Sequence, residues 1–248
     1  MAKAALELYS IRELMQKDVL SALMHTAKAG YDGVEFAGFF DMQAQQLKDK
    51  VDELGLEVCG SHTGWNLLNE NIEEVFAYNK ILDNKNIILP YVPEELRSSA
   101  QAWRNLSAKF NEIGKKCNDA GFVFAYHNHA FEFEKFDTVS GYQIMTENIN
   151  PDYVKLQPDL GWVAFAGEDV ENFLETYKDM ILCIHVKQFK QVGSHEATEV
   201  HKGIVNYPPI IKKCISLKIE WFIIEQEGFD IPVLQSIEEN CSELKKMF

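Results

Sequence analysis

The sequence predicts an α/β protein that folds as a (β/α)8 TIM barrel. Short apolar runs alternate with amphipathic segments eight times, which indicates parallel strands joined by right-handed helical crossovers. The 248 residues provide about 31 for each of eight units, the size of one strand and its helix. No Gly-x-Gly-x-x-Gly or P-loop spacing follows any run, so the open doubly wound sheet, which shares the same alternation, is less favoured.

The predicted strands are runs rich in β-branched and aromatic residues. In chain order they lie at 6–9, 33–36, 56–59, 86–89, 122–126, 153–156, 181–184 and 221–224. The predicted helices carry apolar residues at helical spacing, and several end at a glycine. They lie at 17–29, 43–54, 71–82, 103–117, 138–148, 169–178, 208–217 and 232–247.

The helix at 103–117 has the clearest pattern, since one apolar stripe runs from Trp103 to Cys117 and the segment stops at Gly121. No linker or low-complexity segment interrupts the alternation, so we expect residues 1–248 to form one barrel domain. The longest irregular stretch, 188–206, follows the seventh strand and could act as a lid or substrate loop.

The composition excludes several classes of function. A formal net charge of -14 and a pI of about 4.9 oppose binding to a phosphate backbone, so we expect no nucleic-acid partner. The five cysteines are odd in number and lack C-x-x-C spacing, which argues against a disulfide framework or a zinc ribbon and favours a reduced, cytoplasmic protein. No secretory signal or stretch of roughly 18 uncharged apolar residues is present, so we expect no membrane partner.

Polar side chains recur where the predicted strands end, and in a barrel these ends open into the loops that carry chemistry. The fifth strand leads into His127-Asn128-His129, with Glu132 shortly after. The other candidates, in chain order, are Glu35, His62, Asp159, His185, Lys187, Glu225 and Glu227.

Asp159, His185 and Glu225 follow strands six, seven and eight and offer oxygen and nitrogen donors without sulfur. Such a set suits a divalent ion such as Mn²⁺, Mg²⁺, Co²⁺ or Zn²⁺. Each also has a structural alternative, since His185 could be a core histidine and Asp159 could begin a turn with Gly161. A carboxylate at Glu225 would be partly buried, which is costly without a partner or an ion.

The remaining candidates have open alternatives. Glu35 could be a half-exposed strand residue, and His62 is either a surface residue or part of a substrate pocket. Trp162 could stack on a sugar face or form an apolar cap over the barrel mouth.

Five segments together resemble the sugar phosphate isomerase/epimerase family of xylose-isomerase-like TIM barrels, a group that also contains inosose dehydratases and apurinic-site endonucleases. The resemblance covers nearly the whole chain. It is carried by Gly30-Tyr31-Asp32-Gly33-Val34-Glu35, Tyr126-His127-Asn128-His129-Ala130-Phe131-Glu132-Phe133, Asp159-Leu160-Gly161-Trp162-Val163, His185-Val186-Lys187, and Trp221-Phe222-Ile223-Ile224-Glu225-Gln226-Glu227.

The resemblance implies a metal held by a glutamate after strand five and by Asp, His and Glu after the next three strands. The last three correspond to Asp159, His185 and Glu225, whereas the glutamate position falls on His127. We expect His127 to be the fourth ligand and Glu132 to face substrate. Gln188 and His201-Lys202-Gly203 also depart from the family pattern, which suggests an altered substrate loop.

The activity implied is a metal-dependent isomerase or epimerase of a sugar, sugar phosphate or keto-polyol, acting through a metal-stabilised enediolate. The expected catalytic residues are Glu225, as ligand and base together, with Glu132 and His127. The expected substrate contacts are Glu35, His62, His129, Lys187 and Trp162, with Lys187 neutralising an oxyanion or phosphate.

Three other functions stay open. An inosose-type dehydratase or keto-sugar lyase could use the same site. A repair endonuclease would need more histidines and a basic face, which the net charge opposes. A non-catalytic carbohydrate-binding barrel would have lost part of the site. A small-molecule sugar is the expected partner, and the chain is compatible with a homo-oligomer.

Overall fold

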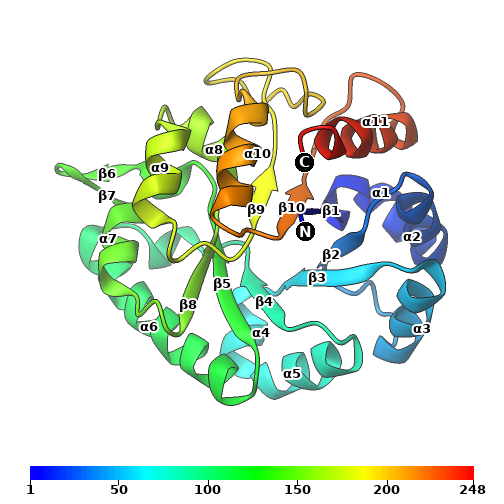
Figure 1. Ribbon diagram of the computed structural model, residues 1–248. Coiled ribbons are helices and arrows are strands. Elements are labelled where there is room, and N and C mark those ends of the chain that lie inside the picture. Colours follow the sequence, from blue (N-terminus) through cyan, green and yellow to red (C-terminus); the bar gives the residue numbers. More distant parts are fainter.

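The computed structural model describes residues 1–248 and contains a ring of eight parallel strands (Figure 1). The strands are β1 (Lys3–Glu7), β2 (Gly33–Ala37), β3 (Glu57–His62), β4 (Asn86–Leu89), β5 (Val123–His127), β8 (Val154–Gln157), β9 (Ile184–Val186) and β10 (Trp221–Ile224). Their order is β8-β5-β4-β3-β2-β1-β10-β9. Two isolated parallel bridges, Leu156 with Ile181 and Asp159 with His185, join β8 to the β9 side. The predicted barrel is confirmed.

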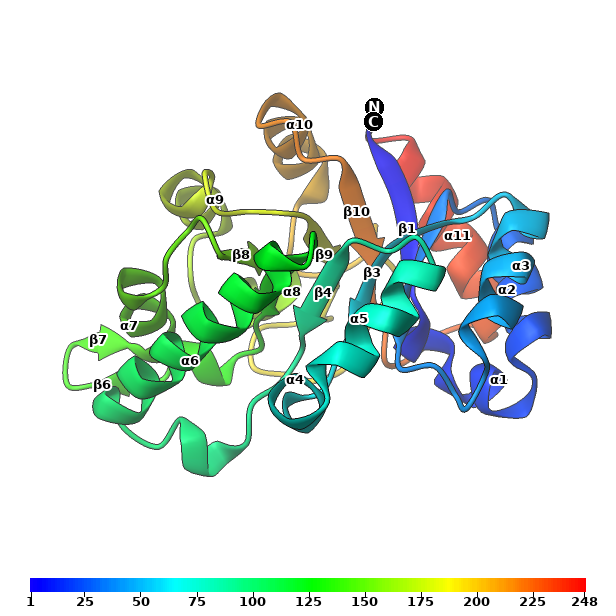
Figure 2. The same ribbon diagram turned by 90° about the horizontal axis from the view of Figure 1, so that it is seen from below.

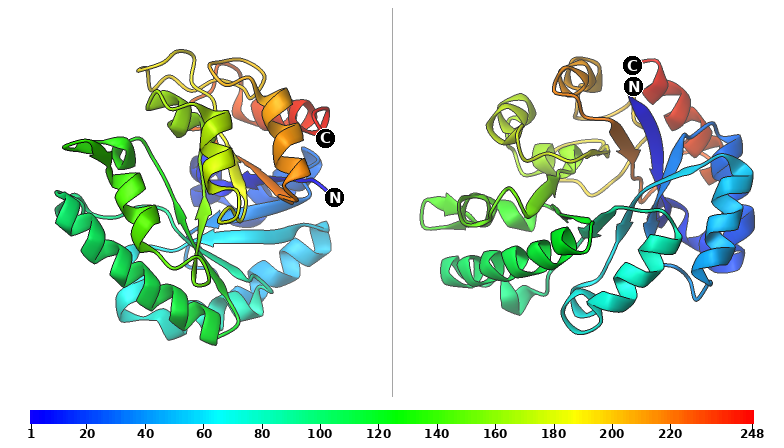
Figure 3. Two further views of the ribbon diagram at one scale, coloured as in Figure 1. Left: turned by 60° about the vertical axis from the view of Figure 1, so that its left-hand side comes forward. Right: turned by 60° about the horizontal axis from the view of Figure 1, so that its bottom comes forward.

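Helices surround the strands on the outside of the ring (Figure 3). They are α1 (Arg12–Lys17), α2 (Val19–Lys28), α3 (Ala44–Leu54), α4 (Trp65–Glu70), α5 (Ile72–Ile81), α6 (Ala100–Asp119), α7 (Gly141–Asn148), α8 (Leu160–Phe165), α9 (Val170–Tyr177), α10 (Tyr207–Ser216) and α11 (Val233–Lys245). Three 3-10 turns span Leu8–Ile11, Glu94–Leu96 and Phe131–Phe133. None of the helices has the length and apolar character required to span a membrane. The two chain ends lie side by side (Figure 2).

Most predicted elements are found within one or two residues of their expected bounds, and two strands match fully. The first and seventh strands are each shifted by about three residues. Leu8 and Ile11 are buried in a 3-10 turn after β1, so their hydrophobicity reflects packing of the turn rather than strand pairing. The short helices α4 and α8 and the hairpin of β6 (Lys135–Phe136) and β7 (Val139–Ser140) were not predicted.

Alternation along each strand separates two sets of side chains. Phe222 and Ile224 pack outward into the large cluster beneath the helices, whereas Ile223 belongs to a small cluster inside the barrel. The other buried members of the inner cluster are Ala5, Cys59 and Cys183. Because successive strand side chains point to opposite faces, residues two positions further on, such as Glu225 and His185, continue the inner set toward the carboxyl end. All five cysteines are free and buried.

The irregular segment 188–206 is held by the side chain of Gln188. Its amide nitrogen donates to the carbonyl oxygens of Val200 (3.2 Å) and Val205 (2.6 Å), and its oxygen accepts from the Val205 N–H (3.1 Å). A Cβ at Gly203 would lie 2.6 Å from the Phe189 carbonyl, so a glycine is required there. The departure at Gln188 therefore anchors this loop.

Candidate active site

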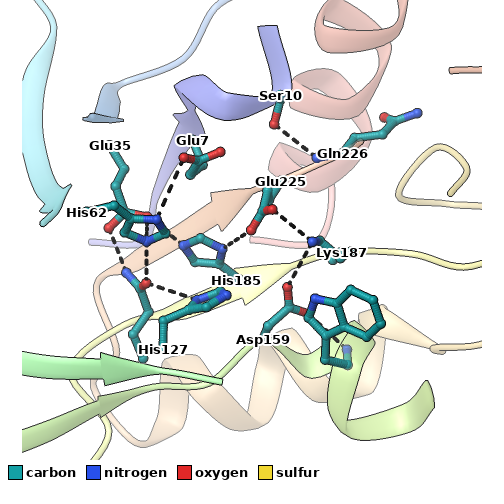
Figure 4. A network of polar contacts seen from close by, with 12 residues as sticks. Glu7, Ser10, Glu35, His62, His127, Asp159, His185, Lys187, Glu225 and Gln226 are labelled. Atoms are coloured by element: carbon teal, nitrogen blue, oxygen red, sulfur yellow. Dashed lines mark hydrogen bonds and ion pairs between the residues drawn. The ribbon is translucent and has the colours of Figure 1, made fainter. Parts of the chain in front are cut away.

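The four predicted ligands meet at the carboxyl end of the barrel (Figure 4). One donor atom from each of His127, Asp159, His185 and Glu225 lies within 4.8 Å of the others, and all four residues are buried. They come from four separate strand ends, so the closing of the ring brings them together. Glu132 does not belong to this group.

Asp159 follows β8 and has two different oxygens. One accepts the backbone N–H of Trp162 (3.0 Å) and so begins helix α8. The other, Oδ2, is buried without a hydrogen-bond partner, and the Lys187 ammonium is 3.6 Å away. Burial raises the pKa of Asp159 to about 6, against the opposing charge of Lys187. An unpaired buried carboxylate oxygen is the position where a cation is expected.

His185 lies between two carboxylates. Its Nδ1 is 2.9 Å from Oε2 of Glu225, and its Nε2 is 2.6 Å from Oε2 of Glu35. Burial opposes a charge on this ring, but the charge of Glu35 and the hydrogen bonds to both carboxylates outweigh it and raise the pKa of His185 to about 10. Metal-binding histidines commonly donate their second ring N–H to a carboxylate, and Glu35 supplies that partner here.

This position of Glu35 corrects the expectation that it binds substrate. The residue is fully buried and does not line the cavity at the barrel mouth. Its oxygens lie near the Nε2 atoms of His185, His62 (3.2 Å) and Gln157 (2.7 Å). Glu35 therefore supports the imidazoles from below, because β2 continues two residues further and it is Ala37, on the same face, that reaches the cavity.

Gln157 at the end of β8 was not predicted as a site residue, although it orients two histidines. Its amide nitrogen donates to Oε1 of Glu35, which can only accept, so its oxygen must face the rings of His127 (3.2 Å) and His62 (3.0 Å). His127 then carries its proton on Nδ1 and keeps the Nε2 lone pair free. That tautomer is the one a ligand requires at Nε2.

Lys187 is buried among carboxylates. Its ammonium donates to Glu225 (2.8 Å) and Glu227 (2.7 Å) in addition to its approach to Asp159. Burial disfavours the charge, but these three carboxylates outweigh it and hold the pKa of Lys187 above its usual range. The lysine thus neutralises the acidic ligands, and it is not free to meet a substrate phosphate as expected.

Glu132 lies in the 3-10 turn after β5, away from the mouth. It accepts hydrogen bonds from the Tyr126 hydroxyl (2.7 Å) and from the His129 backbone N–H (2.8 Å). Burial raises its pKa to about 8. In this structure Glu132 does not line the mouth cavity, and its hydrogen bond to His129 fixes the His127-Asn128-His129 turn.

A cavity of about 460 Å³ opens at the mouth beside the cluster. Among the predicted site residues it is lined by His62, His127, His129 and Glu225. Glu7, which no sequence argument selected, also lines it. A larger hollow of about 590 Å³ lies between α7 and α9 and contains none of the predicted residues, so the smaller cavity is the candidate site.

Trp162 does not line this cavity. Its ring packs against Phe189 (4.6 Å between centroids) and Phe165 (5.2 Å), under the 188–206 loop, and the Lys187 ammonium lies 5.1 Å from the ring centroid. Its indole N–H is buried without a partner. Trp162 thus packs beneath the 188–206 loop and over Lys187, and neither of the two expected positions, on a sugar face or as a cap over the mouth cavity, describes it in this structure.

The donor set fits a divalent ion. It combines two imidazoles and two carboxylates and leaves one carboxylate oxygen without a partner. A third carboxylate, Glu35, lies behind one of the histidines. His127 completes the group where the resemblance would place a glutamate. The composition of nitrogen and oxygen donors suits Mn²⁺, Co²⁺ or Zn²⁺ as well as Mg²⁺.

Comparison with known proteins agrees with this geometry. The family model described as "Xylose isomerase-like TIM barrel" matches residues 23–247. An inosose dehydratase from Lacticaseibacillus casei is 25% identical over 241 residues, covering 86% of this chain and 79% of the relative. A solved sugar phosphate isomerase/epimerase from Parabacteroides distasonis superposes with a TM-score of 0.84 at 19% identity, covering 99% of this chain and 98% of the other. A solved L-ribulose 3-epimerase gives a TM-score of 0.74 at 13% identity, covering 100% and 94%.

Proposed function

Because the chain belongs to the xylose isomerase-like TIM barrel family, we propose that it is a divalent-metal-dependent isomerase or epimerase of a sugar or keto-polyol. The observation that carries this proposal is the meeting of His127, Asp159, His185 and Glu225 beside the mouth cavity. The similar proteins are an inosose dehydratase, a sugar phosphate isomerase/epimerase and an L-ribulose 3-epimerase, and all of these names concern sugars or polyols.

A bound ion would be held by these four residues and would draw electrons from a carbonyl and an adjacent hydroxyl, which acidifies the C–H between them. Glu225 is the residue placed to accept that proton, since it is a ligand and also lines the cavity. Burial alone would raise the pKa of Glu225, but the charge of Lys187 and the hydrogen bond from His185 hold it well below its usual range. The carboxylate is therefore ionised and able to receive a proton.

The other residues of the cavity bind and orient. His62 and His129 face the cavity and can contact substrate hydroxyl groups. Burial lowers the pKa of His129 to about 4, so its ring is neutral at pH 7 and can both donate and accept. Lys187 holds the Glu225 carboxylate in place through its 2.8 Å contact.

An inosose-type dehydratase is the second candidate, and His127 favours it. Inversion at one carbon requires an acid or base on each face of the substrate. Burial holds the pKa of His127 well below its usual range, so a neutral imidazole stands where the resemblance places a glutamate base. Dehydration needs one base to remove the proton and a proton donor at the leaving hydroxyl, and it does not need a second carboxylate base at the position of His127.

Glu225→Gln tests the proposal. The purified protein is loaded with Co²⁺, and bound metal is measured by mass spectrometry. Inosose and D-fructose are then incubated with it in deuterated water. Isomerisation or epimerisation gives one added deuterium, whereas dehydration gives loss of water. We expect the wild type to show one of these changes and Glu225→Gln to reduce it on the order of 10²–10⁴-fold.

Glu57→Gln is the matched control. Glu57 is an exposed carboxylate paired with Lys3, and it lies at the start of β3, whereas His62 at the other end of the strand lies at the cavity. It should keep both metal content and turnover. Unchanged metal content and turnover in Glu225→Gln would refute the proposal, as would a wild type that binds no ion.

A further inference from the structure

We propose that Glu7 binds the substrate directly and that the substrate it binds is an uncharged sugar or polyol, with a hydroxyl group on the Glu7 carboxyl. This inference rests on the proposed function and names the substrate class of the same site. Glu7 is the last residue of β1 and is paired in register with Glu35 of β2. Unlike Glu35, it lines the cavity together with His62, His127 and Glu225.

The Glu7 carboxyl lacks a partner within the protein. The residue has 0% exposure, and both of its carboxyl oxygens are buried without a hydrogen bond. The Nδ1 atom of His62 is 3.9 Å away, beyond hydrogen-bond distance (Figure 4). Glu7 does not belong to the four-residue donor group, nor to the second set of side chains that could share an ion, His62, His127 and His185. An unpaired buried carboxyl is unfavourable, and a ligand in the cavity that Glu7 borders is the partner we propose for it.

Glu132 shows what a structural carboxyl looks like in this protein. It is equally buried, and burial raises the pKa of both groups to about 8. Both Glu132 oxygens, however, accept hydrogen bonds from the protein, and the residue does not line the cavity. Glu7 differs from it only in facing the cavity and in lacking those bonds. A hydroxyl group, which can donate and accept, satisfies a carboxyl in either protonation state.

The charge of the cavity identifies the substrate as uncharged. Its lining includes Glu7, Glu225 and Glu227 but no lysine or arginine. Lys187 is 1% exposed and already contacts Glu225 and Glu227. Apart from the proposed ion, a phosphate ester entering this cavity would meet carboxylates and no lysine or arginine of the lining, which opposes binding.

The walls suit a sugar ring. Tyr9 and Tyr91 line the cavity and are 44% and 48% exposed, so each offers an aromatic face or edge to sugar C–H groups. Arg12 lies over the Tyr9 ring and donates to the Tyr9 carbonyl, and Arg97 lies near the Tyr91 ring and donates to the Val92 carbonyl.

The test measures binding, stability and turnover separately. Inosose, D-fructose and D-fructose 6-phosphate are titrated calorimetrically into the Co²⁺-loaded wild type, Glu7→Gln and Glu7→Met. We expect an uncharged sugar to bind at least tenfold more tightly than the phosphate ester. Glu7→Met should weaken that binding about tenfold or more and raise KM, with the Co²⁺ affinity within twofold of wild type. Glu7→Gln, which keeps a polar group, should fall between the two.

Thermal unfolding distinguishes a binding role from a structural one. Because Glu7→Met removes an unpaired buried carboxyl, we expect Tm to rise by roughly 2–6 °C. A lower Tm with unchanged sugar affinity would make Glu7 structural and overturn the proposal. Tighter binding of the phosphate ester, or no binding of any of the three sugars, would overturn it as well. A protein that binds sugar through Glu7 but exchanges no proton would refute the proposed reaction and still support Glu7.

Discussion

Glu35 provides the sharpest test of the ion site, because it contacts a ligand without being one. Its Oε2 lies 2.6 Å from Nε2 of His185 and its side chain is fully buried. Glu35→Gln keeps an acceptor for that N–H and removes the charge. Loss of such a supporting partner typically weakens metal binding 10- to 100-fold, about 1.4–2.8 kcal/mol, and we expect this loss for Co²⁺ at pH 8.

The Co²⁺ affinities of the wild type and of Glu35→Gln should depend differently on pH. The charge of Glu35 helps raise the pKa of His185 to about 10, so an ion must displace a proton from this ring in the wild type. Wild-type affinity should therefore rise with pH toward 10. In Glu35→Gln the ring loses its anionic partner, its pKa falls, and the affinity levels off at lower pH. The difference between the two proteins should widen as pH increases.

Isothermal titration with Co²⁺ at pH 7 and pH 8.5 measures both effects, with Glu57→Gln as the matched exposed control. Circular dichroism checks that each variant is folded. If Glu35→Gln binds Co²⁺ within twofold of the wild type at both pH values, Glu35 does not support a metal-binding histidine, and the reading of His185 as a ligand through Nδ1 fails.

Three further variants test individual contacts. Glu132→Gln should remove a pH dependence of the free energy of unfolding. Because the pKa of Glu132 is about 8 in the folded protein and near 4.5 in the unfolded chain, its stabilisation is complete below pH 4.5 and is lost as pH rises through 8, by at most about 1.4 kcal/mol per pH unit. The Tm of the wild type should therefore fall over this pH window, and the Tm of the variant should stay flatter. Gln157→Leu removes the acceptor that holds the proton on Nδ1 of His127, so we expect a mixture of His127 tautomers and Co²⁺ binding about tenfold weaker. The ¹⁵N chemical shifts of the His127 ring measure the mixture, and unchanged shifts would contradict this prediction. Lys187→Met should destabilise the ion-free protein by about 3 kcal/mol, because it leaves buried carboxylates without their cation, and added Co²⁺ should restore most of the Tm. An equal decrease in Tm with and without Co²⁺ would disprove this.

The barrel could be predicted because its pattern is local. Helical spacing and apolar runs repeat in every unit, so eight units and their order follow from the chain itself. Where a strand begins and ends depends on its hydrogen bonds to distant strands, which the local pattern does not contain. This is why the first strand was expected three residues too late. Leu8 and Ile11 are as buried as strand residues, but they pack from a 3-10 turn. Their residue types reveal that they are hydrophobic, but they do not reveal the hydrogen bonds that form the turn.

That small shift had a consequence for the site. With the first strand placed at 6–9, Glu7 fell in the middle of a strand, whereas the structure makes it the last residue of β1 at the mouth. The opposite happened with Glu35. It was expected at the end of a strand facing substrate, and it lies instead one layer of side chains below the mouth cavity. Which layer a side chain occupies depends on the stagger of neighbouring strands, such as the register shift between Val34 and Glu35, and no periodicity reveals it.

His127 changes the charge balance of the whole site. Once an ion has displaced the proton of His185, two carboxylates and two neutral imidazoles carry a charge of about -2, which a divalent ion balances. A third carboxylate in place of His127 would leave an excess negative charge. Among the four ligands only His127 and Glu225 line the cavity, so Glu225 is the one ligand carboxylate that can reach a substrate C–H. A single ionised base opposite a neutral ring suits proton transfer on one face of the substrate. We therefore expect the departure at strand five to favour one-base isomerisation or dehydration over inversion between two carboxylates.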